Sequence, residues 1–291
     1  MSIPSFTYQL PPAFEQLSWT AVAGIDEVGR GAWFGPVVAA AVQLSETTIL
    51  ELAAAGVKDS KKLTPTLRAS LSTLIRSKAI ACGIGWASAR EIDRLNILQA
   101  TQLAIRRSVL KLDPPPQLCL VDGNRLIPNL SIPQQAIVKG DSHCIVIAAS
   151  SILAKVWRDE LMTRLDRTYP QYGLAKHKGY GTKQHKQALQ SYGPCFHHRF
   201  SFAPVRQHLE REAGSVGWLW ESSPDWGNPP PISTGGGRSE VGCWESSPDW
   251  GNPPPISTGG GRSEVGCWES SPDWGNPPPI STGGGRSEVG C

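Results

Sequence analysis

The sequence predicts an α/β domain, a mixed β-sheet flanked by helices with a helical C-terminal part, followed by a repeat tail. Short apolar or alternating runs are typical of strands, and apolar residues at helical spacing separate and follow them. The last 72 residues are one 24-residue unit, WESSPDWGNPPPISTGGGRSEVGC, present three times without change. The 291 residues therefore divide into a domain over 1–219 and a tail over 220–291.

Five strands are predicted in the domain from runs of this kind. Their ranges are Thr20–Asp26, Pro36–Leu44, Ala79–Ala87, Leu118–Asp122 and Gln135–Lys139. Helices are expected to pack on the mixed sheet that these strands form.

Helical periodicity lies between and after these strands. One apolar stripe predicts a single helix that begins near Ser88 and ends at the three prolines 114–116, with buried positions Leu95, Leu98, Ile105, Val109 and Leu112. A second stripe predicts a helix after Gly140-Asp141-Ser142, with buried positions Ile145, Ala149, Ile152 and Val156. Further helices are expected toward Leu209.

Charge also separates the two parts of the chain. Residues 1–219 hold 25 Lys and Arg against 16 Asp and Glu, a net charge of +9, whereas the tail carries −6 and brings the whole chain to +3. Lys and Arg side chains that contact phosphates release counterions from a polyanion. The basic domain therefore predicts a polyanionic substrate.

Several classes of protein do not fit the sequence. Its longest apolar run, Ala32–Val42, is shorter than the roughly 18 to 20 residues that span a bilayer. The first twenty residues lack the basic start and apolar centre of a signal peptide. We therefore expect a cytoplasmic protein, and a monomer. The absence of Cys-x-x-Cys or Cys/His spacing favours reduced, structural thiols at Cys82, Cys119, Cys144 and Cys195.

Four acidic residues stand at the ends of predicted strands or directly after them. Asp26 and Glu27 end the first strand, Asp122 ends the fourth, and Asp141 follows the fifth. Carboxylates at neighbouring strand ends converge on one edge of a sheet, where they repel one another unless a cation neutralises them. Oxygen ligands favour Mg²⁺ or Mn²⁺. Two such ions about 4 Å apart can activate a water and stabilise the leaving oxygen of a phosphodiester.

Two of these acids have simpler interpretations. Asp141 is equally suited to cap a helix, and Asp122 followed by Gly123 is typical of a turn. Asp26 and Glu27 are harder to explain without a partner, because adjacent charges after an apolar strand are unfavourable. The pattern thus indicates a metal-dependent phosphoryl-transfer site.

Basic and glycine-rich segments supply candidate substrate contacts. Lys58, Lys61 and Lys62 cluster in VKDSKKL, and a second basic region runs from 176 to 186. Within that region Tyr180 stands between two glycines, where its ring can stack on a sugar or a base. Gly29-Arg30-Gly31 lets backbone N–H groups approach a ligand closely, because glycine has no Cβ.

Eight motifs in order resemble the ribonuclease HII family, the bacterial type 2 ribonucleases H. They are GIDEVGRGAWFGPVVAAAV, DSKKL, EIDRLNILQAT, VDGN, VKGDS, AASSILAKVWRD, PQYGLAKHKGYGT and HHRFSFAPV, which extend from about Val22 to Val205. The resemblance implies a ribonuclease H-like fold. It also implies Mn²⁺- or Mg²⁺-dependent cleavage of the RNA strand of RNA–DNA hybrids, and of single ribonucleotides embedded in DNA, leaving a 5′-phosphate and a 3′-hydroxyl.

The same resemblance assigns roles to individual residues. Its four catalytic, metal-binding acids fall on Asp26, Glu27, Asp122 and Asp141, the residues reached above from strand ends. It implies that Gly29, Arg30 and Gly31 sense the ribose 2′-hydroxyl, which distinguishes RNA from DNA. Tyr180 matches the family tyrosine that packs on the deoxyribose after the ribonucleotide, and Lys61 lies in the DSKKL motif.

The sequence departs from the family pattern at a few positions. Ala32 replaces a proline after Gly-Arg-Gly, Trp33 and Phe34 are bulkier than the usual pair, and Ser150 replaces an alanine. Since none of these is an acidic ligand, the departures concern loop shape and rate.

Two alternative functions remain. A ribonuclease HIII usually lacks the arginine of Gly-Arg-Gly and carries an added N-terminal domain, whereas Arg30 is present here and only some twenty residues precede the first strand. The other is a module that binds hybrids without cutting them, although binding alone gains nothing from acids gathered near phosphates.

The tail has two readings as well. Its PPP and GGG runs, and its lack of periodic apolar residues, predict disorder. Alternatively, Asn-Pro-Pro-Pro in an extended conformation and the tryptophan pairs serve as anchors for a partner that the sequence does not identify.

Overall fold

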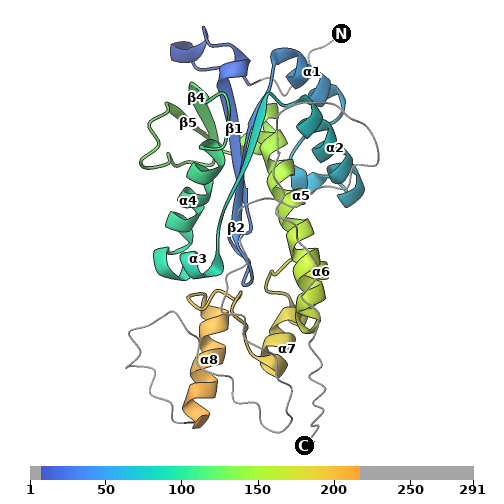
Figure 1. Ribbon diagram of the computed structural model, residues 1–291, viewed down its shortest axis with the longest axis vertical. Helices are drawn as coiled ribbons and strands as arrows, with labels where there is room; N and C mark the ends of the chain where they lie inside the picture. The colour runs from blue at the N-terminus through green and yellow to red at the C-terminus, as the bar shows by residue number, and fades with distance from the viewer. Residues whose placement is uncertain (1–7, 217–291) are drawn as a thin grey trace, which may run out of the picture. The chain divides into compact units, whose positions relative to one another are not determined.

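The computed structural model describes residues 8–216 (Figure 1). Its five-stranded sheet has the order β3-β2-β1-β4-β5. The strands are β1 (Val22–Val28), β2 (Val37–Gln43), β3 (Ala81–Ala87), β4 (Leu118–Asp122) and β5 (Gln134–Ile137). β1 pairs antiparallel with β2 and parallel with β4. β2 and β3 are antiparallel, whereas β4 and β5 are parallel, so the predicted mixed sheet is confirmed.

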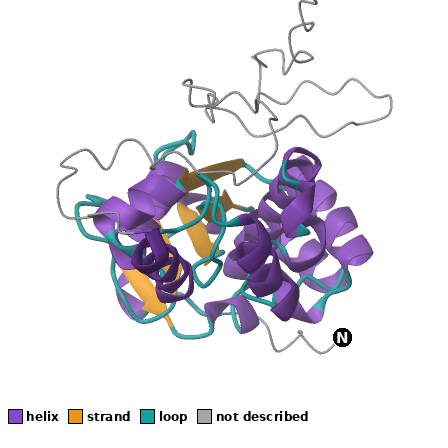
Figure 2. Ribbon diagram, turned by 90° about the horizontal axis from the view of Figure 1, so that it is seen from below, coloured by secondary structure: helices purple, strands orange, loops and turns teal. Residues whose placement is uncertain are grey.

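Helices cover both faces of this sheet (Figures 1 and 2). α4 packs on β1, β2 and β3, while the long α5 packs on the other side against β1 and β2. The α-helices are α1 (Glu46–Ala54), α2 (Pro65–Lys78), α3 (Ala89–Leu95), α4 (Ile97–Val109), α5 (Ile145–Thr168), α6 (Leu174–His177), α7 (Lys183–Tyr192) and α8 (Ala203–Val216). Short 3-10 turns occupy Pro12–Phe14, Trp19–Ala21, Ser60–Lys62, Gly140–Ser142 and Pro170–Tyr172. The last three α-helices form the expected helical C-terminal part.

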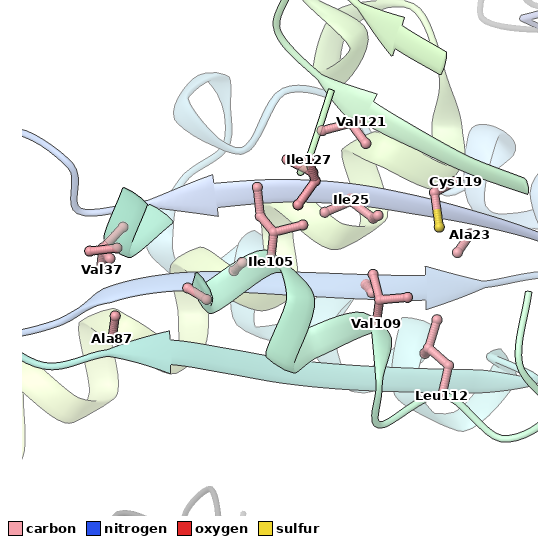
Figure 3. Packing of buried hydrophobic residues seen from close by; sticks show 14 of the residues in the cluster. Ala23, Ile25, Val37, Ala87, Ile105, Val109, Leu112, Cys119, Val121 and Ile127 are labelled. Carbon is pink, nitrogen blue, oxygen red and sulfur yellow. The ribbon is translucent and has the colours of Figure 1, made fainter. Parts of the chain in front are cut away.

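The core under α4 is made of small and branched side chains (Figure 3). Ala23 and Ile25 of β1 lie there with Ile105 and Val109 of α4 and with Leu112, all nearly inaccessible to solvent. Each buried side chain of the size of Val or Ile contributes about 1.5–3 kcal/mol to folding. This packing fixes β1, and with it the residues at its end.

The helix predicted as one piece from Ser88 is in fact two. Its start is right, since Ser88 and Glu91 form a reciprocal capping box. The chain breaks at Asn96, which has a φ of 70° and accepts hydrogen bonds from Leu98 N and Gln99 N through its side chain. The predicted stripe holds only for Ile105, Val109 and Leu112, because Leu95 and Leu98 on either side of the break are partly exposed.

Three further predictions concern the chain as a whole. Among residues 8–216 no helix is long and apolar enough to cross a membrane. The four cysteines of that range form no disulfide, as the sequence predicts. The end of the domain at residue 219 and the predicted disorder of the repeats lie outside the described residues.

Candidate active site

The sheet topology brings the four acids to one edge. Parallel pairing places Ile25 opposite Val121, so Asp26 and Asp122 follow at the same ends of β1 and β4. Asp122 in turn lies opposite Ile137 of β5, and the chain after β5 carries Asp141 in the turn Gly140–Ser142. The four carboxyls therefore come from three adjacent strands, as the strand-end pattern predicts.

Local hydrogen bonds orient these carboxylates. Asp122 Oδ1 accepts a hydrogen bond from Gly140 N at 2.7 Å, which ties the end of β4 to the segment that carries Asp141. Asp26 Oδ1 accepts from Glu27 N at 2.7 Å. The chain bends at Gly123, which has a φ of 103°, and Gly123 N donates a hydrogen bond of 2.9 Å to Ile137 O at the end of β5. Asp122 thus stands at the end of β4, directly before a bend in the chain.

Asp141 is not the cap of the following helix. The N-cap of α5 is Cys144, and Asp141 is buried three residues earlier. Its carboxylate accepts a bond from Ser142 Oγ at 3.4 Å and lies 3.8 Å from Lys61 Nζ. The capping interpretation is therefore wrong, because the chain makes a separate 3-10 turn before the helix begins.

The electrostatics of the edge are those of crowded carboxylates. Burial, then the charges of Glu27 and Asp122, raise the pKa of Asp26 well above its usual value. Burial also raises the pKa of Glu27, against the opposing effect of Arg30. The pKa of Asp122 is raised by burial and by the charge of Asp141. Each shift means that a negative charge at this edge is unfavourable without a cation.

Two cations of the protein itself approach the acids. Arg30 NH1 donates to Glu27 Oε1 at 3.0 Å, from a half-exposed side chain. Burial lowers the pKa of Lys61, but the charges of Asp141, Asp26, Asp59 and Asp122 outweigh it and raise the pKa overall. Both side chains are flexible and partly exposed, so they offset only part of the charge.

A pocket of about 230 Å³ opens beside these residues. It is lined by Asp26, Glu27, Val28, Ser60, Lys61, Ser151, Lys155 and Tyr180. Asp26, Glu27 and Tyr180 thus share one cavity with Lys61.

Sequence reasoning missed three of the lining residues, Ser60, Ser151 and Lys155. Ser60 Oγ and Ser151 Oγ lie 2.9 Å apart and are buried. A hydrogen bond from the Ser151 side chain lowers the pKa of Asp26, against the larger effect of burial. Lys155 Nζ is bonded to Asp159 Oδ1 at 2.7 Å. A signal was available, because residues 151 and 155 lie on one face of the predicted helix.

Gly29, Arg30 and Gly31 lie in the loop after β1. Gly29 has a φ of 88°, and a Cβ there would lie 2.2 Å from Nε of Arg158, so only glycine fits. Arg30 and Gly31 are exposed. The loop therefore has a buried base and an exposed tip next to Glu27.

The segment that carries Tyr180 lies against this loop. Gly179 O accepts hydrogen bonds from Trp33 N and Phe34 N at 2.9 and 3.3 Å. Trp33 packs on Gly181, where a Cβ would lie 2.1 Å from the indole ring. The bulky Trp33 and Phe34 thus pack between the loop after β1 and the Tyr180 segment. Ala32 is buried. Ser150, the other departure, donates to Ile147 O at 2.7 Å within α5.

The Tyr180 segment packs on three buried histidines, which are called the histidine cluster. They are His177, His185 and His198. Gly179 N donates to His177 Nδ1 at 3.2 Å, and His185 Nδ1 lies 3.0 Å from Tyr180 O. His185 Nε2 and His198 Nε2 are 3.1 Å apart. Burial lowers the pKa of His185 to about 4 and that of His198 well below its usual value. His185 and His198 are therefore neutral at pH 7.

The four acids offer only carboxylate oxygens to a divalent metal ion. Among residues 8–216, no group of three or more His, Cys, Asp or Glu side chains is arranged to hold an ion. The chemistry nevertheless fits, because three of the four carboxyls have raised pKa values and all offer oxygen donors. Asp26, Glu27, Asp122 and Asp141 are therefore suited to Mg²⁺ or Mn²⁺ once side chains such as Glu27 turn from their protein partners.

Comparisons with known proteins agree with this geometry. The chain is 59% identical over 188 residues to ribonuclease HII of Acaryochloris marina, a match that covers 65% of the chain and 95% of the relative. It is 59% identical over 187 residues to ribonuclease HII of Trichodesmium erythraeum, covering 64% and 89%.

Solved structures share the fold. Ribonuclease H2 from Pyrococcus horikoshii OT3 is 28% identical with a TM-score of 0.56, covering 65% of this chain and 97% of that one. Ribonuclease HII of Archaeoglobus fulgidus, solved as a complex with PCNA, is 26% identical with a TM-score of 0.55, covering 64% and 96%. The sequence model of the family described as ribonuclease HII matches residues 23–205. The chain belongs to the ribonuclease HII family.

Proposed function

We propose that this protein is a metal-dependent endoribonuclease that cleaves the RNA strand of RNA–DNA hybrids and single ribonucleotides embedded in DNA, leaving a 5′-phosphate and a 3′-hydroxyl. The observation that carries the proposal is that Asp26, Glu27 and Asp122 lie close together beside a loop whose tip, Arg30 and Gly31, is exposed. Membership of the ribonuclease HII family supports the same reaction class.

In this proposal Asp26, Glu27, Asp122 and Asp141 hold two Mg²⁺ or Mn²⁺ ions. When bound, these ions would supply an activated water and neutralise charge at the leaving 3′ oxygen. The ends of β1 and β4 fix the backbone positions from which Asp26, Glu27 and Asp122 would hold the ions. The bond from Gly140 N to Asp122 Oδ1, 2.7 Å long, keeps the Asp141 segment in register with that edge.

The substrate is recognised by groups around the acids. Lys61, exposed and 3.8 Å from Asp141, attracts the phosphate next to the scissile bond. The backbone of Gly29, Arg30 and Gly31 reads the ribose 2′-hydroxyl. Tyr180, which lines the same cavity as Asp26, packs on the following deoxyribose.

The test uses a duplex DNA with one internal ribonucleotide and a label at each end of that strand. We expect cleavage next to the ribonucleotide in Mg²⁺ or Mn²⁺, none in excess chelator, and none of the matched all-DNA duplex. The end groups follow from treatment of the products with phosphatase and polynucleotide kinase.

The same assay separates the proposal from its alternative. A module that binds hybrids without cutting them would retard the labelled duplex in a gel with or without metal and leave both strands intact. That result, at protein concentrations that saturate the duplex, would refute the proposed function.

A further inference from the structure

Two arginines buried between the Gly-Arg-Gly loop and the Tyr180 segment have no part in the site described so far. Arg158 of α5 and Arg199, in the segment before α8, are both fully inaccessible to solvent. Arginine is rarely buried to this extent, because removing its charge from water is costly. Burial, then the charge of Arg158, lower the pKa of Arg199 to about 9. A structural reason is needed to keep both charges there.

The Arg199 guanidinium donates to three backbone carbonyls of the loop after β1. Nε donates to Gly35 O at 2.9 Å, NH1 to Arg30 O at 2.8 Å, and NH2 to Gly29 O at 2.7 Å. Its own backbone N donates to Trp33 O at 2.8 Å. One residue thus fixes both ends and the middle of the loop. The planar fork of arginine suits this task, whereas the single ammonium of lysine does not.

Arg158 does the same from the other side. Nε donates to Pro36 O at 3.1 Å and NH2 to Phe34 O at 3.1 Å. NH1 donates at 2.8 Å to Lys178 O, two residues before Tyr180, and the guanidinium lies 5.5 Å from the Tyr180 ring centre. The two arginines therefore tie the loop over 29–36 to the segment that carries Tyr180.

Pinning these carbonyls also sets the direction of the amides at the loop tip. In a trans peptide the C=O of one residue and the N–H of the next point in opposite directions. With Gly29 O and Arg30 O bonded to Arg199, the N–H groups of Arg30 and Gly31 point away from the protein interior. Both residues are exposed, so these amides lie at the surface of the loop tip.

We propose that Arg199 is a positioning residue for ribonucleotide recognition: it holds the loop over 29–36 so that the amides of Arg30 and Gly31 are presented to the ribose before substrate binds. This inference rests on the proposed function for its substrate. Its mechanical part, the pinning of the loop, does not.

The first experiment measures amide hydrogen exchange in the substrate-free protein. Arg199→Lys keeps the positive charge and loses the fork, so we expect exchange over 29–36 to become on the order of tenfold faster or more, with α5 and β3 unchanged. The matched control is Arg107→Lys, a half-exposed arginine that bonds to Glu91 and to Trp86 O on the far side of the sheet. The control should leave exchange over 29–36 as in the wild type. Unchanged exchange over 29–36 in folded Arg199→Lys would overturn the inference.

The second experiment asks whether the effect passes through the loop. We expect Arg199→Lys to lower kcat/KM on the single-ribonucleotide duplex on the order of tenfold, and to add little in an Arg30→Ala background, because both changes act on one recognition element. Additive losses would show that Arg199 supports the fold alone and would also overturn the inference.

If Arg199→Lys does not fold, Arg158→Lys and the wild-type protein give the same test. Loosening over 29–36 is expected in Arg158→Lys, and the Nε–H protons of Arg158 and Arg199 should exchange slowly in wild-type NMR spectra. Rapid exchange of both protons would contradict the pinning. A wild-type protein that fails to cleave the duplex refutes the proposed function and leaves these exchange results to decide the pinning separately.

Discussion

Asp26 of the acidic edge and His185 of the histidine cluster both lie beside the Tyr180 segment and respond to burial in opposite ways. Asp26 is buried with a raised pKa, close to other carboxylates. His185 is buried with a pKa lowered to about 4, and its ring nitrogens lie within hydrogen-bond distance of Tyr180 O and His198. At the acidic edge, burial therefore makes the charged form of the carboxyls unfavourable, whereas His185 and His198 are neutral and lie within hydrogen-bond distance of each other.

This difference predicts opposite responses to pH. A carboxyl whose pKa is raised in the folded state contributes fully to the free energy of unfolding below its pKa in the unfolded chain. That contribution is lost as the pH rises through its pKa in the folded protein. A histidine with a lowered pKa stabilises the fold above about 6.5, and this is lost as the pH falls toward 4. The contribution of Asp26 to stability thus falls as the pH rises, and that of His185 falls as the pH drops.

The largest effect is expected from Asp26→Asn. Changing an outer partner of a metal site costs about 10- to 100-fold, so losing a ligand should lower Mn²⁺-dependent cleavage by more than about 100-fold. The metal-free protein should at the same time melt a few degrees higher at pH 7, because an unfavourable buried charge is gone.

Single-turnover cleavage and thermal melts in chelator measure the two effects. Glu51→Gln, an exposed acid paired with Lys78, removes the same charge and should change neither. Wild-type cleavage by Asp26→Asn would refute its assignment as a ligand.

His185→Asn tests the other side of the comparison. In the wild type, the free energy of unfolding should fall as pH drops from about 6.5 to 4, and a shift of this size in one histidine accounts for up to about 3 kcal/mol. The asparagine side chain keeps an N–H donor for Tyr180 O but does not titrate. In the variant, the free energy of unfolding should therefore depend much less on pH between about 4 and 6.5. Urea titrations at several pH values measure this pH dependence. The same pH dependence in both proteins would show that the pKa of His185 is not lowered in the folded protein.

A smaller effect is expected from Ser151→Ala. The hydroxyl bonds to Asp26 and lowers its pKa, so removing it should raise that pKa further and shift the acid limb of the pH–rate profile to higher pH. A loss of about tenfold in rate is expected for such a partner. Ser150→Ala is the matched control, since that hydroxyl bonds only within α5 and the family has alanine there. If the acid limb of the pH–rate profile is the same in Ser151→Ala as in the wild type, Ser151 does not control the pKa of Asp26.

The smallest effect is expected from ending the chain after Gly217. This removes the acidic repeats from the basic domain and leaves both the edge and the cluster intact. We expect unchanged cleavage and unchanged salt dependence. A steeper salt dependence in the shortened protein would instead show that the repeats compete for the substrate surface.

The sheet and its acids were predictable because their signals are local. Strand ends were right to within about two residues, and Asp26, Asp122 and Asp141 followed from the order of apolar runs and carboxylates. The break at Asn96 was missed, since an asparagine in a left-handed conformation leaves the apolar spacing almost unchanged.

Contacts between distant segments could not be predicted from such patterns. Ser60 meets Ser151 across 91 residues, and Arg199 reaches Gly29 across 170. Neither contact is reflected in the spacing of apolar residues along the sequence. Arg199 lies in the motif HHRFSFAPV, which predicts family membership but no role for this residue. Because most arginines are exposed, nothing in the sequence indicates that the Arg199 side chain is buried.

The long reach of Arg199 has a consequence for synthesis. The Gly-Arg-Gly loop is among the first parts of the domain to leave the ribosome, yet the residue that fixes it is 170 positions later. β4 and the turn at Asp141 emerge well before it. A nascent or prematurely terminated chain ending before residue 199 would therefore carry all four acids with an unfixed recognition loop. Selectivity for the ribonucleotide would be acquired after the catalytic acids, in the final stretch of translation.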